Sequence, residues 1–210
     1  VSFGYILIKD HFDETIKTPD DIEKKDIKFL SWVPHLDLSG NTLYGNNELV
    51  SLYEQNTHIS ESFRTIKSRI QHTRTELETP YTILVTSSAE SEGKTFVSIN
   101  LADSFAQSNK KTLVIDCDLR RPRIQSVFGV DKKPGLTDYF YHDVKMNDII
   151  RKSKINNLSY ITAGTIPSNP AEILESQLMK NFLKQIRDSF DVILLDSPPI
   201  IAVIDAEILS

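Results

Sequence analysis

The sequence predicts an α/β fold in which a mainly parallel sheet lies between two layers of helices. Two observations support this prediction. Four short and nearly continuous apolar runs are typical of strands that are buried on both faces, and helical patterns separate the runs, as in βαβ units. The runs are 81–86, 112–115, 158–162 and 191–195. The 210 residues, 40% of them hydrophobic and 25% charged, suffice for a buried core.

The first 47 residues are predicted to form a small arm and a linker that precede the sheet. Val1 to Ile8 is an apolar run that fits either an edge strand or mobile terminus, or the cytoplasmic end of a membrane helix. Thr18 to Asp21 is typical of a helix start, and Ile27 to Val33 predicts a short strand that Pro34 ends. Residues 35–47 are rich in turn formers and predict a linker. No apolar run is long enough to cross a bilayer by itself.

Three segments are predicted to be helices. Ser60 to Leu77 has apolar residues at helical spacing and a basic remaining face, which we expect to be solvated. A second helix is expected from Lys94 to about Asn109. The third begins with Asn169 as its cap and Pro170 in its first position. Its apolar stripe is Leu174, Leu178, Phe182 and Ile186.

The residues that follow the first buried run match the spacing of a phosphate-binding loop. Residues 88–95 read G-x-x-x-x-G-K-[ST], with Ser88 in place of the first glycine. In such a loop, backbone N–H groups and a helix N-terminus face an anion. Lys94 would reach the terminal phosphates, and the Thr95 hydroxyl would bind magnesium. An ordinary strand–helix turn is the alternative interpretation.

Two further buried runs end in carboxylates. Asp116 and Asp118 follow the second run and alternate to the same side, and Asp196 ends the fourth run. Because ligands bind at the carboxyl ends of parallel strands, these side chains should lie beside the phosphate loop. Solvated strand ends or helix caps are the alternative. Together with Lys94 and Thr95, they predict a nucleotide–magnesium site for phosphoryl transfer.

Charge and cysteine content exclude several classes of protein. The net charge of −5 provides no general field for a polyanion, so nucleic acid is not an expected partner. The single cysteine, Cys117, can form neither an internal disulfide nor an iron–sulfur site by itself, which fits a reducing compartment.

Three motifs, taken in order, resemble those of a known family. SAESEGKT (88–95), TLVIDCDLRRP (112–122) and VILLDSPP (192–199) are similar to the Walker A, Walker A′ and Walker B motifs of the bacterial tyrosine kinases, which control capsule and exopolysaccharide export. GTIPSNPAEIL (164–174) is similar to the family's stretch between the last two motifs. The resemblance covers about residues 48–210 and implies a P-loop NTPase-type three-layer fold.

The resemblance also implies an activity and its residues. The protein would be an ATP- and Mg²⁺-dependent protein-tyrosine kinase that phosphorylates, in trans, a C-terminal tyrosine cluster not present in this chain. Lys94, Asp116 and Asp118 would be catalytic, with either aspartate as the base, and Thr95, Asp116 and Asp196 would bind the metal. The nucleotide-binding residues would be Ser91, Glu92, Gly93, Lys94, Thr95 and Phe96.

Partners follow from the same resemblance. Glu61, Arg64 and Lys67 are similar to the family's E-x-x-R-x-x-R helix, with lysine where the last arginine is usual, and imply a ring of subunits formed through residues 61–68. Residues 16–23 are similar to the juxtamembrane tail of polysaccharide chain-length regulators. The implied partners are ATP and ADP, the membrane part of a polysaccharide co-polymerase in the same or another chain, and a cognate tyrosine phosphatase. The implied location is the cytoplasmic side of the bacterial inner membrane.

The sequence also departs from the family. Glu90 and Ser91 stand where proline and glycine are more usual, which adds negative charge near the phosphates. The chain stops at Ser210, where the resemblance would supply further strands, an adenine pocket and a tyrosine-rich tail, so the kinase domain is expected to be incomplete. Residues 139–141 (Tyr-Phe-Tyr) are expected to pack rather than to accept phosphate.

Two other functions remain open at this point. Partitioning and septum-positioning ATPases share the loop, but they place a second lysine where this chain has Ala89. A non-catalytic, nucleotide-gated scaffold of the polysaccharide export machinery is the other alternative. In that role, Arg120, Arg121 and Arg123 would contact phosphotyrosine, a neighbouring subunit or anionic lipid.

Overall fold

A computed structural model describes residues 21–22, 27–34, 57–73, 80–201 and 205–209 of the chain. The chain divides into two compact units, within residues 1–31 and 32–210. In the first unit, Asp21 and Ile22 are helical. The predictions for Val1 to Ile8, for the helix start at Thr18 and for the linker at 35–47 lie outside the described residues.

The strand predicted at Ile27 to Val33 is wrong, because these residues form neither helix nor strand. Two of the large apolar side chains in this segment, Ile27 and Trp32, are 56% and 69% exposed. A strand of this length is stable when a neighbouring strand pairs with it and its apolar face is covered. Apolar composition alone does not supply either condition.

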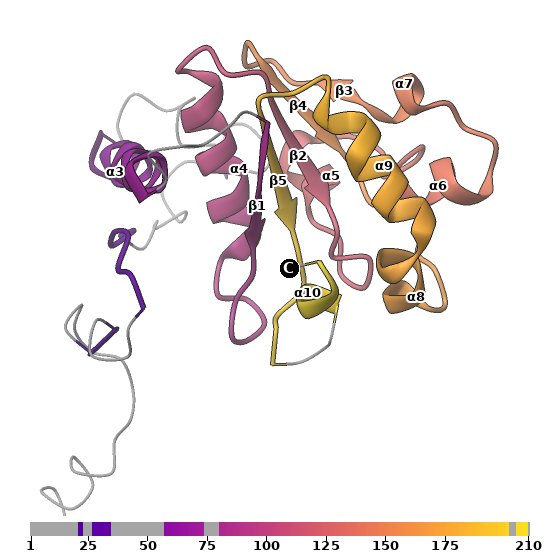
Figure 1. Cartoon of the computed structure of the whole chain (residues 1–210), viewed down its shortest axis with the longest axis horizontal. Coiled ribbons are helices and arrows are strands. Elements are labelled where there is room, and N and C mark those ends of the chain that lie inside the picture. The colour runs from indigo at the N-terminus through magenta and orange to yellow at the C-terminus, as the bar shows by residue number, and fades with distance from the viewer. Residues whose placement is uncertain (1–20, 23–26, 35–56, 74–79, 202–204, 210) are drawn as a thin grey trace, which may run out of the picture. The chain divides into compact units, whose positions relative to one another are not determined.

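The second unit is built around a five-stranded sheet with the order β1-β5-β2-β4-β3 (Figure 1). The first four strands in this order are parallel, and β3 runs antiparallel to β4. The strands are β1 (Tyr81–Val85), β2 (Thr112–Asp116), β3 (Arg151–Lys152), β4 (Leu158–Ile161) and β5 (Val192–Asp196). The four predicted strands are therefore confirmed, and β3 is an addition that its two residues could not reveal.

Two helices cover opposite faces of this sheet. Successive side chains of a strand point to opposite faces, so the apolar strands provide packing surfaces for both helices. Helix α9 (Gln177–Arg187) packs its Met179, Phe182 and Ile186 with Ile193 and Leu195 of β5. Helix α4 (Lys94–Ala106) covers the other face (Figure 1). The shorter helices are α5 (Ile124–Phe128), α6 (Leu136–Tyr141), α7 (Met146–Ile149), α8 (Pro170–Glu175) and α10 (Asp205–Ile208). The predicted three-layer α/β fold is confirmed.

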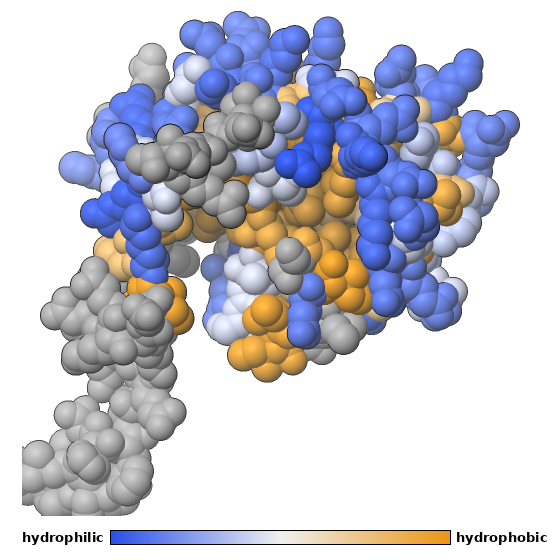
Figure 2. Space-filling model, viewed as in Figure 1, coloured by the Kyte–Doolittle hydropathy of each residue, from blue (hydrophilic) through white to orange (hydrophobic). Residues whose placement is uncertain are grey.

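β1 lies at one edge of the sheet and is less covered than β2 and β5. Residues of β2 and β5 are buried throughout, whereas Thr82 in β1 is exposed and the three residues after it are partly buried. Figure 2 shows apolar residues at the surface around β1 and β5, between α4 and α9. Among the helices of the described part of the chain, none is both long and apolar enough to cross a membrane.

The single helix predicted from Asn169 onward is two helices. Ser176 has an extended backbone (ψ 152°) between α8 and α9, and its hydroxyl accepts a hydrogen bond from the N–H of Met179, 3.1 Å away. A serine that satisfies an N–H in this way starts a new helix, which interrupts the apolar stripe. Leu178 consequently is 51% exposed rather than buried. Asn169 makes no side-chain cap, and its amide instead donates to Glu172.

Helix α3 (Thr57–Thr73) packs against α4. The side chain of Phe63 is 2% exposed, and its ring lies 5.8 Å from that of Phe96. This agrees with the helix predicted from Ser60, although residues 74–79 are not described. Of the basic residues expected to be solvated, Arg64 and Arg69 are exposed, whereas Lys67 is partly buried, and Arg74 lies outside the described residues.

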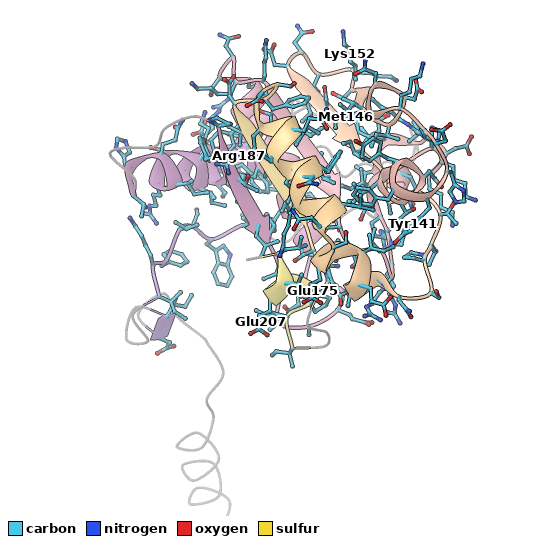
Figure 3. All side chains as sticks on the ribbon, turned by 45° about the vertical axis from the view of Figure 1, so that its right-hand side comes forward. Tyr141, Met146, Lys152, Glu175, Arg187 and Glu207 are labelled. Atoms are coloured by element: carbon cyan, nitrogen blue, oxygen red, sulfur yellow. The ribbon has the colours of Figure 1, made fainter. Side chains whose placement is uncertain are left out.

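The aromatic stretch at 139–141 packs in part. Tyr139 and Phe140 are partly buried and pack against the core, with their rings 5.5 and 5.8 Å from the ring of the buried Phe182. Tyr141, which Figure 3 labels, is 60% exposed. The expected packing holds for the first two residues and not for the third, because α6 turns its end toward solvent.

Candidate active site

The candidate site lies where the carboxyl ends of β1, β5 and β2 meet. Val85 pairs with Asp196, and Asp196 pairs with Asp116, so the three strand ends stand in register. Hydrogen bonds join the segments that follow β1 and β5: the Thr86 hydroxyl donates to the Pro198 carbonyl at 2.8 Å, and the Ile200 N–H donates to the Ser87 carbonyl at 2.9 Å. The loops that carry the three motifs therefore meet at one edge of the sheet.

The phosphate loop leads directly into α4. Gly93 is the N-cap of the helix in the left-handed conformation (φ 87°), which glycine adopts at little cost. Ser91 also has a positive φ of 63°, in a position where a serine is strained. The predicted strand–loop–helix arrangement is therefore present, with Lys94 at the first helical position.

Lys94 forms an ion pair with Asp118 at the helix start. Its Nζ lies 2.9 Å from Oδ2 of Asp118, and the two side chains are 11% and 4% exposed. The other carboxylate oxygen of Asp118 accepts a hydrogen bond from the Arg121 N–H at 2.9 Å. The lysine and the second acid of the TLVIDCDLRRP motif, predicted to share a site, are thus in direct contact.

Asp196 is fully buried at the end of β5. Its Oδ1 accepts a hydrogen bond from the Ser98 hydroxyl at 3.0 Å, and the Thr95 side chain also hydrogen-bonds to this carboxylate. Burial raises the pKa of Asp196 to about 6, although these hydrogen bonds and the charge of Lys94 act to lower it. Its Oδ2 is buried and has no hydrogen-bond partner among the described residues.

Asp116 lies beside Asp196 at the end of β2. Its Oδ2 accepts hydrogen bonds from the N–H groups of Arg123 and Ile124, at 3.1 and 3.0 Å, where α5 begins. Burial, together with the charge of Asp196, raises the pKa of Asp116 well above its ordinary value. Its Oδ1 is buried without a hydrogen-bond partner in the described part of the chain.

These unused oxygens fit a magnesium ion. The two oxygens belong to carboxylates on neighbouring strand ends, one of which, Asp196, also binds the Thr95 side chain. Buried oxygens without partners are costly unless something binds them. Across the described residues, no group of three His, Cys, Asp or Glu side chains forms a complete metal cage. Magnesium typically keeps several waters and binds one or two carboxylates plus phosphates, so a partial set of protein ligands is what it requires.

The acids of the phosphate loop have partners of their own. The Glu92 carboxylate accepts hydrogen bonds from the N–H groups of Ser88 and Ala89, at 2.9 and 3.0 Å. The Glu90 carboxylate pairs with Arg121. The negative charge that the sequence adds to this loop is thereby partly neutralised within the protein.

Two residues of the site are missed by the motif analysis. Ser98 binds Asp196 from one turn into α4, and its position four residues after Lys94 is the signal that could have revealed it. Asp205, fully buried in α10, binds the Arg120 guanidinium through both carboxylate oxygens, at 2.9 and 3.1 Å. Nothing in the local sequence distinguishes Asp205 from a surface acid. Arg120 and Arg121 thus bind acids of this chain, contacts that the sequence did not predict.

The predicted self-association residues of α3 differ in their contacts. Glu61 and Arg64 pair with each other on the exposed surface. Lys67 instead donates to the Ser104 carbonyl at 3.2 Å and to the Ser108 hydroxyl; Ser104 lies in α4 and Ser108 just after it. Similarly, the Phe96 side chain packs on Phe63, so only the backbone of Phe96 can face a nucleotide.

A phosphate loop at the carboxyl edge of a parallel sheet, with two acidic strand ends beside it, defines a nucleotide-binding domain of the P-loop NTPase class. A family model described as an AAA domain matches residues 82–210. The tyrosine-protein kinase YwqD of Bacillus subtilis is 35% identical over 161 residues, which are 77% of this chain and 68% of that protein. The chain belongs to the family of bacterial tyrosine-protein kinases.

Two further comparisons agree with this assignment. A putative tyrosine-protein kinase in the cps region of Klebsiella pneumoniae is 26% identical across all of this chain, which spans 30% of that protein. The kinase domain of the Escherichia coli tyrosine kinase ETK superposes with a TM-score of 0.83 and 28% identity, over 93% of this chain and 78% of that structure.

The septum-positioning class fits less well. The cell division ATPase MinD of Pyrococcus furiosus superposes with a TM-score of 0.51 over 61% of this chain and 54% of that structure. The relatives' names and the closer superposition on ETK both support the ATP-dependent tyrosine kinase over this alternative.

Proposed function

We propose that the chain binds ATP with Mg²⁺ and transfers its γ-phosphate to tyrosine through the residues of the candidate site. The observation that carries this proposal is the Lys94–Asp118 ion pair at the start of α4, next to the unpartnered oxygens of Asp116 and Asp196. This arrangement provides a cation for phosphates, oxygens for a metal and an acid to receive a proton. Phosphoryl transfer depends mostly on such positioning and charge neutralisation.

In this proposal, the N–H groups of residues 91–96 and the Lys94 ammonium hold the phosphates. Thr95, Asp116 and Asp196 would hold Mg²⁺, which when bound neutralises charge that develops on the phosphates. Ser98 keeps one oxygen of Asp196 occupied, and the other oxygen would be the one to hold the metal.

The ion pair suggests which aspartate accepts the tyrosine proton. Asp116 has one oxygen fixed by two backbone N–H groups, and its other oxygen suits the metal. Asp118 has its charge balanced by Lys94. When the phosphates attract Lys94, Asp118 loses this partner and becomes available to a hydroxyl. We therefore assign Asp118 as the general base and Asp116 as a metal ligand.

The role of the whole protein is also a proposal. The family resemblance and the cps relative support regulation of capsule or exopolysaccharide synthesis at the cytoplasmic side of the membrane. The proposed partners are other subunits of the same kinase, the membrane part of a polysaccharide co-polymerase and a cognate tyrosine phosphatase. The division into an arm (1–47) and a kinase domain (48–210) remains a prediction.

The test is Lys94→Met in the full-length protein, with a tyrosine-rich peptide as substrate. We expect phosphotyrosine formation to fall by at least about 10²-fold, because the variant lacks the cation that neutralises the phosphates. The circular-dichroism spectrum should not change. Lys180→Met, which removes an exposed lysine on α9, is the matched control and should retain wild-type activity.

The same assay separates the alternatives. Undiminished phosphorylation by Lys94→Met would contradict the proposed site. Hydrolysis of ATP by the wild-type protein without a phosphotyrosine product would favour a partitioning-type ATPase. Binding of ATP without hydrolysis or transfer would favour the nucleotide-gated scaffold.

A further inference from the structure

The Glu92 side chain folds back onto the phosphate loop that contains it. Its Oε2 accepts hydrogen bonds from the N–H groups of Ser88 and Ala89, at 2.9 and 3.0 Å. The Ser88 hydroxyl donates to the same carboxylate, 2.8 Å from each oxygen. These bonds lower the pKa of Glu92, as expected for a carboxylate that accepts several N–H and O–H groups.

The loop needs such bonds because its own sequence does not favour the closed shape. Ser91 has a φ of 63°, where a residue with a side chain is strained by about 1 kcal/mol or more. Glu90, which precedes Ser91, does not restrict the backbone as a proline would. A loop with these residues would open readily in the absence of other contacts, and an open loop does not align its N–H groups.

Glu92 closes the loop across this strained part. Ser88 and Ala89 stand before Ser91, and Glu92 stands after it, so the hydrogen bonds join the two ends of the strained segment. Charge-assisted hydrogen bonds are about twice as strong as neutral ones, which suits them to offset this strain.

We propose that Glu92 is a positioning residue: its carboxylate holds the phosphate loop closed, so that the loop's remaining N–H groups are arranged before the nucleotide binds. The inference rests on the proposed nucleotide site and adds to it a residue that acts through the loop rather than on the phosphates. It also means that the Glu92 side chain supplies a restriction that a proline at position 90 would give to the backbone, and offsets strain that a glycine at position 91 would avoid.

If Glu92 acted only through its charge, its removal would have the opposite effect. A carboxylate near a triphosphate repels it, so loss of the Glu92 charge would strengthen nucleotide binding. Glu90 offers the matched comparison, because it carries the same charge two residues away and pairs with Arg121 on the exposed surface instead of binding loop N–H groups. Exposed ion pairs of this kind contribute little to stability.

The experiment measures ADP affinity with a fluorescent ADP analogue and Mg²⁺, for the full-length wild-type protein and for Glu92→Gln, Glu92→Ala and Glu90→Gln. We expect the Kd to rise about threefold for Glu92→Gln, which keeps one neutral acceptor, and about tenfold for Glu92→Ala, which keeps none. For Glu90→Gln, the Kd should stay the same or fall. In the kinase assay, the Glu92 variants should have a higher KM for ATP and an unchanged kcat. Once the nucleotide is bound, its own contacts hold the loop closed, and the Glu92 hydrogen bonds are no longer needed.

Each other outcome overturns the inference. Glu92 variants that bind ADP as tightly as the wild type, or more tightly, would show that the carboxylate does not prepare the loop. Equal effects of Glu92→Gln and Glu90→Gln would show that only charge matters. A wild-type protein that binds no ADP would instead overturn the proposed function, and the inference with it, so the two failures are distinguishable.

Discussion

At the scale of single residues, the buried Asp196 couples protonation to folding and to metal binding. Its pKa is raised from 3.8 to about 6 in the folded protein without metal, chiefly by burial. The folded state therefore binds this proton more tightly than the unfolded state does. The resulting stabilisation is fully present below about pH 4 and is lost as the pH rises through about 6.

This leads to a prediction for Asp196→Asn, which mimics the protonated carboxyl group. In EDTA, the variant should be more stable than the wild type above pH 6, and this advantage should disappear toward pH 4. Urea unfolding of both proteins across this pH range measures the difference. Addition of Mg²⁺ should stabilise the wild type above pH 6 but not the variant, because a metal ligand must be deprotonated. A stability difference that is constant with pH would contradict the raised pKa.

At the scale of elements, the Arg120–Asp205 ion pair joins the loop after β2 to α10. Asp205 is fully buried, whereas the Arg120 side chain is 42% exposed. The hydrogen bonds to Asp205, together with the charge of its carboxylate, raise the pKa of Arg120. Asp118 lies two residues before Arg120, so the pair also fixes the segment that carries the proposed base.

We predict that Arg120→Ala lowers the free energy of unfolding by about 2–3 kcal/mol, because it leaves a buried carboxylate without its partner. The cost is below that of a fully buried pair because Arg120 is partly solvated. The double variant Arg120→Ala/Asp205→Asn should be destabilised by less than the sum of the single variants. Arg120→Lys should be intermediate, since it keeps the charge but not the two-pronged geometry. Additive effects in urea unfolding would show that the pair is not coupled.

The same elements show what the sequence could and could not predict. The buried strands were predictable because each is a continuous apolar run. The position of the site was predictable because a phosphate loop and two acids follow three of these runs. The break between α8 and α9 at Ser176 was not predictable, since a serine inside an apolar stripe can be either solvated or a helix cap. The Arg120–Asp205 pair joins residues that are 85 positions apart, and no local pattern encodes such a contact. Likewise, the Glu92 hydrogen bonds depend on a loop shape that composition does not specify.

At the scale of the whole molecule, the three residues of the self-association motif in α3 differ in their contacts. Lys67 binds the carbonyl of Ser104 in α4, and partial burial together with the nearby Arg64 lowers its pKa. The side chains of Glu61 and Arg64 are 62% and 56% exposed. Lys67 is therefore suited to hold α3 against α4, and Glu61 and Arg64 are suited to contact another subunit.

This division predicts different results for variants of the three residues in the full-length protein. Arg64→Glu should weaken self-association with little change in thermal stability, because an exposed pair of residues three apart contributes only about 0.2–0.5 kcal/mol. The exchange Glu61→Arg/Arg64→Glu keeps the attraction within the helix but reverses the charges offered to a neighbour, so it should weaken association equally. Lys67→Ala should instead lower the melting temperature, because α3 loses its polar anchor on α4. Sedimentation velocity and thermal unfolding measure the two properties separately, and normal association of the exchanged variant would rule out Glu61 and Arg64 as an interface.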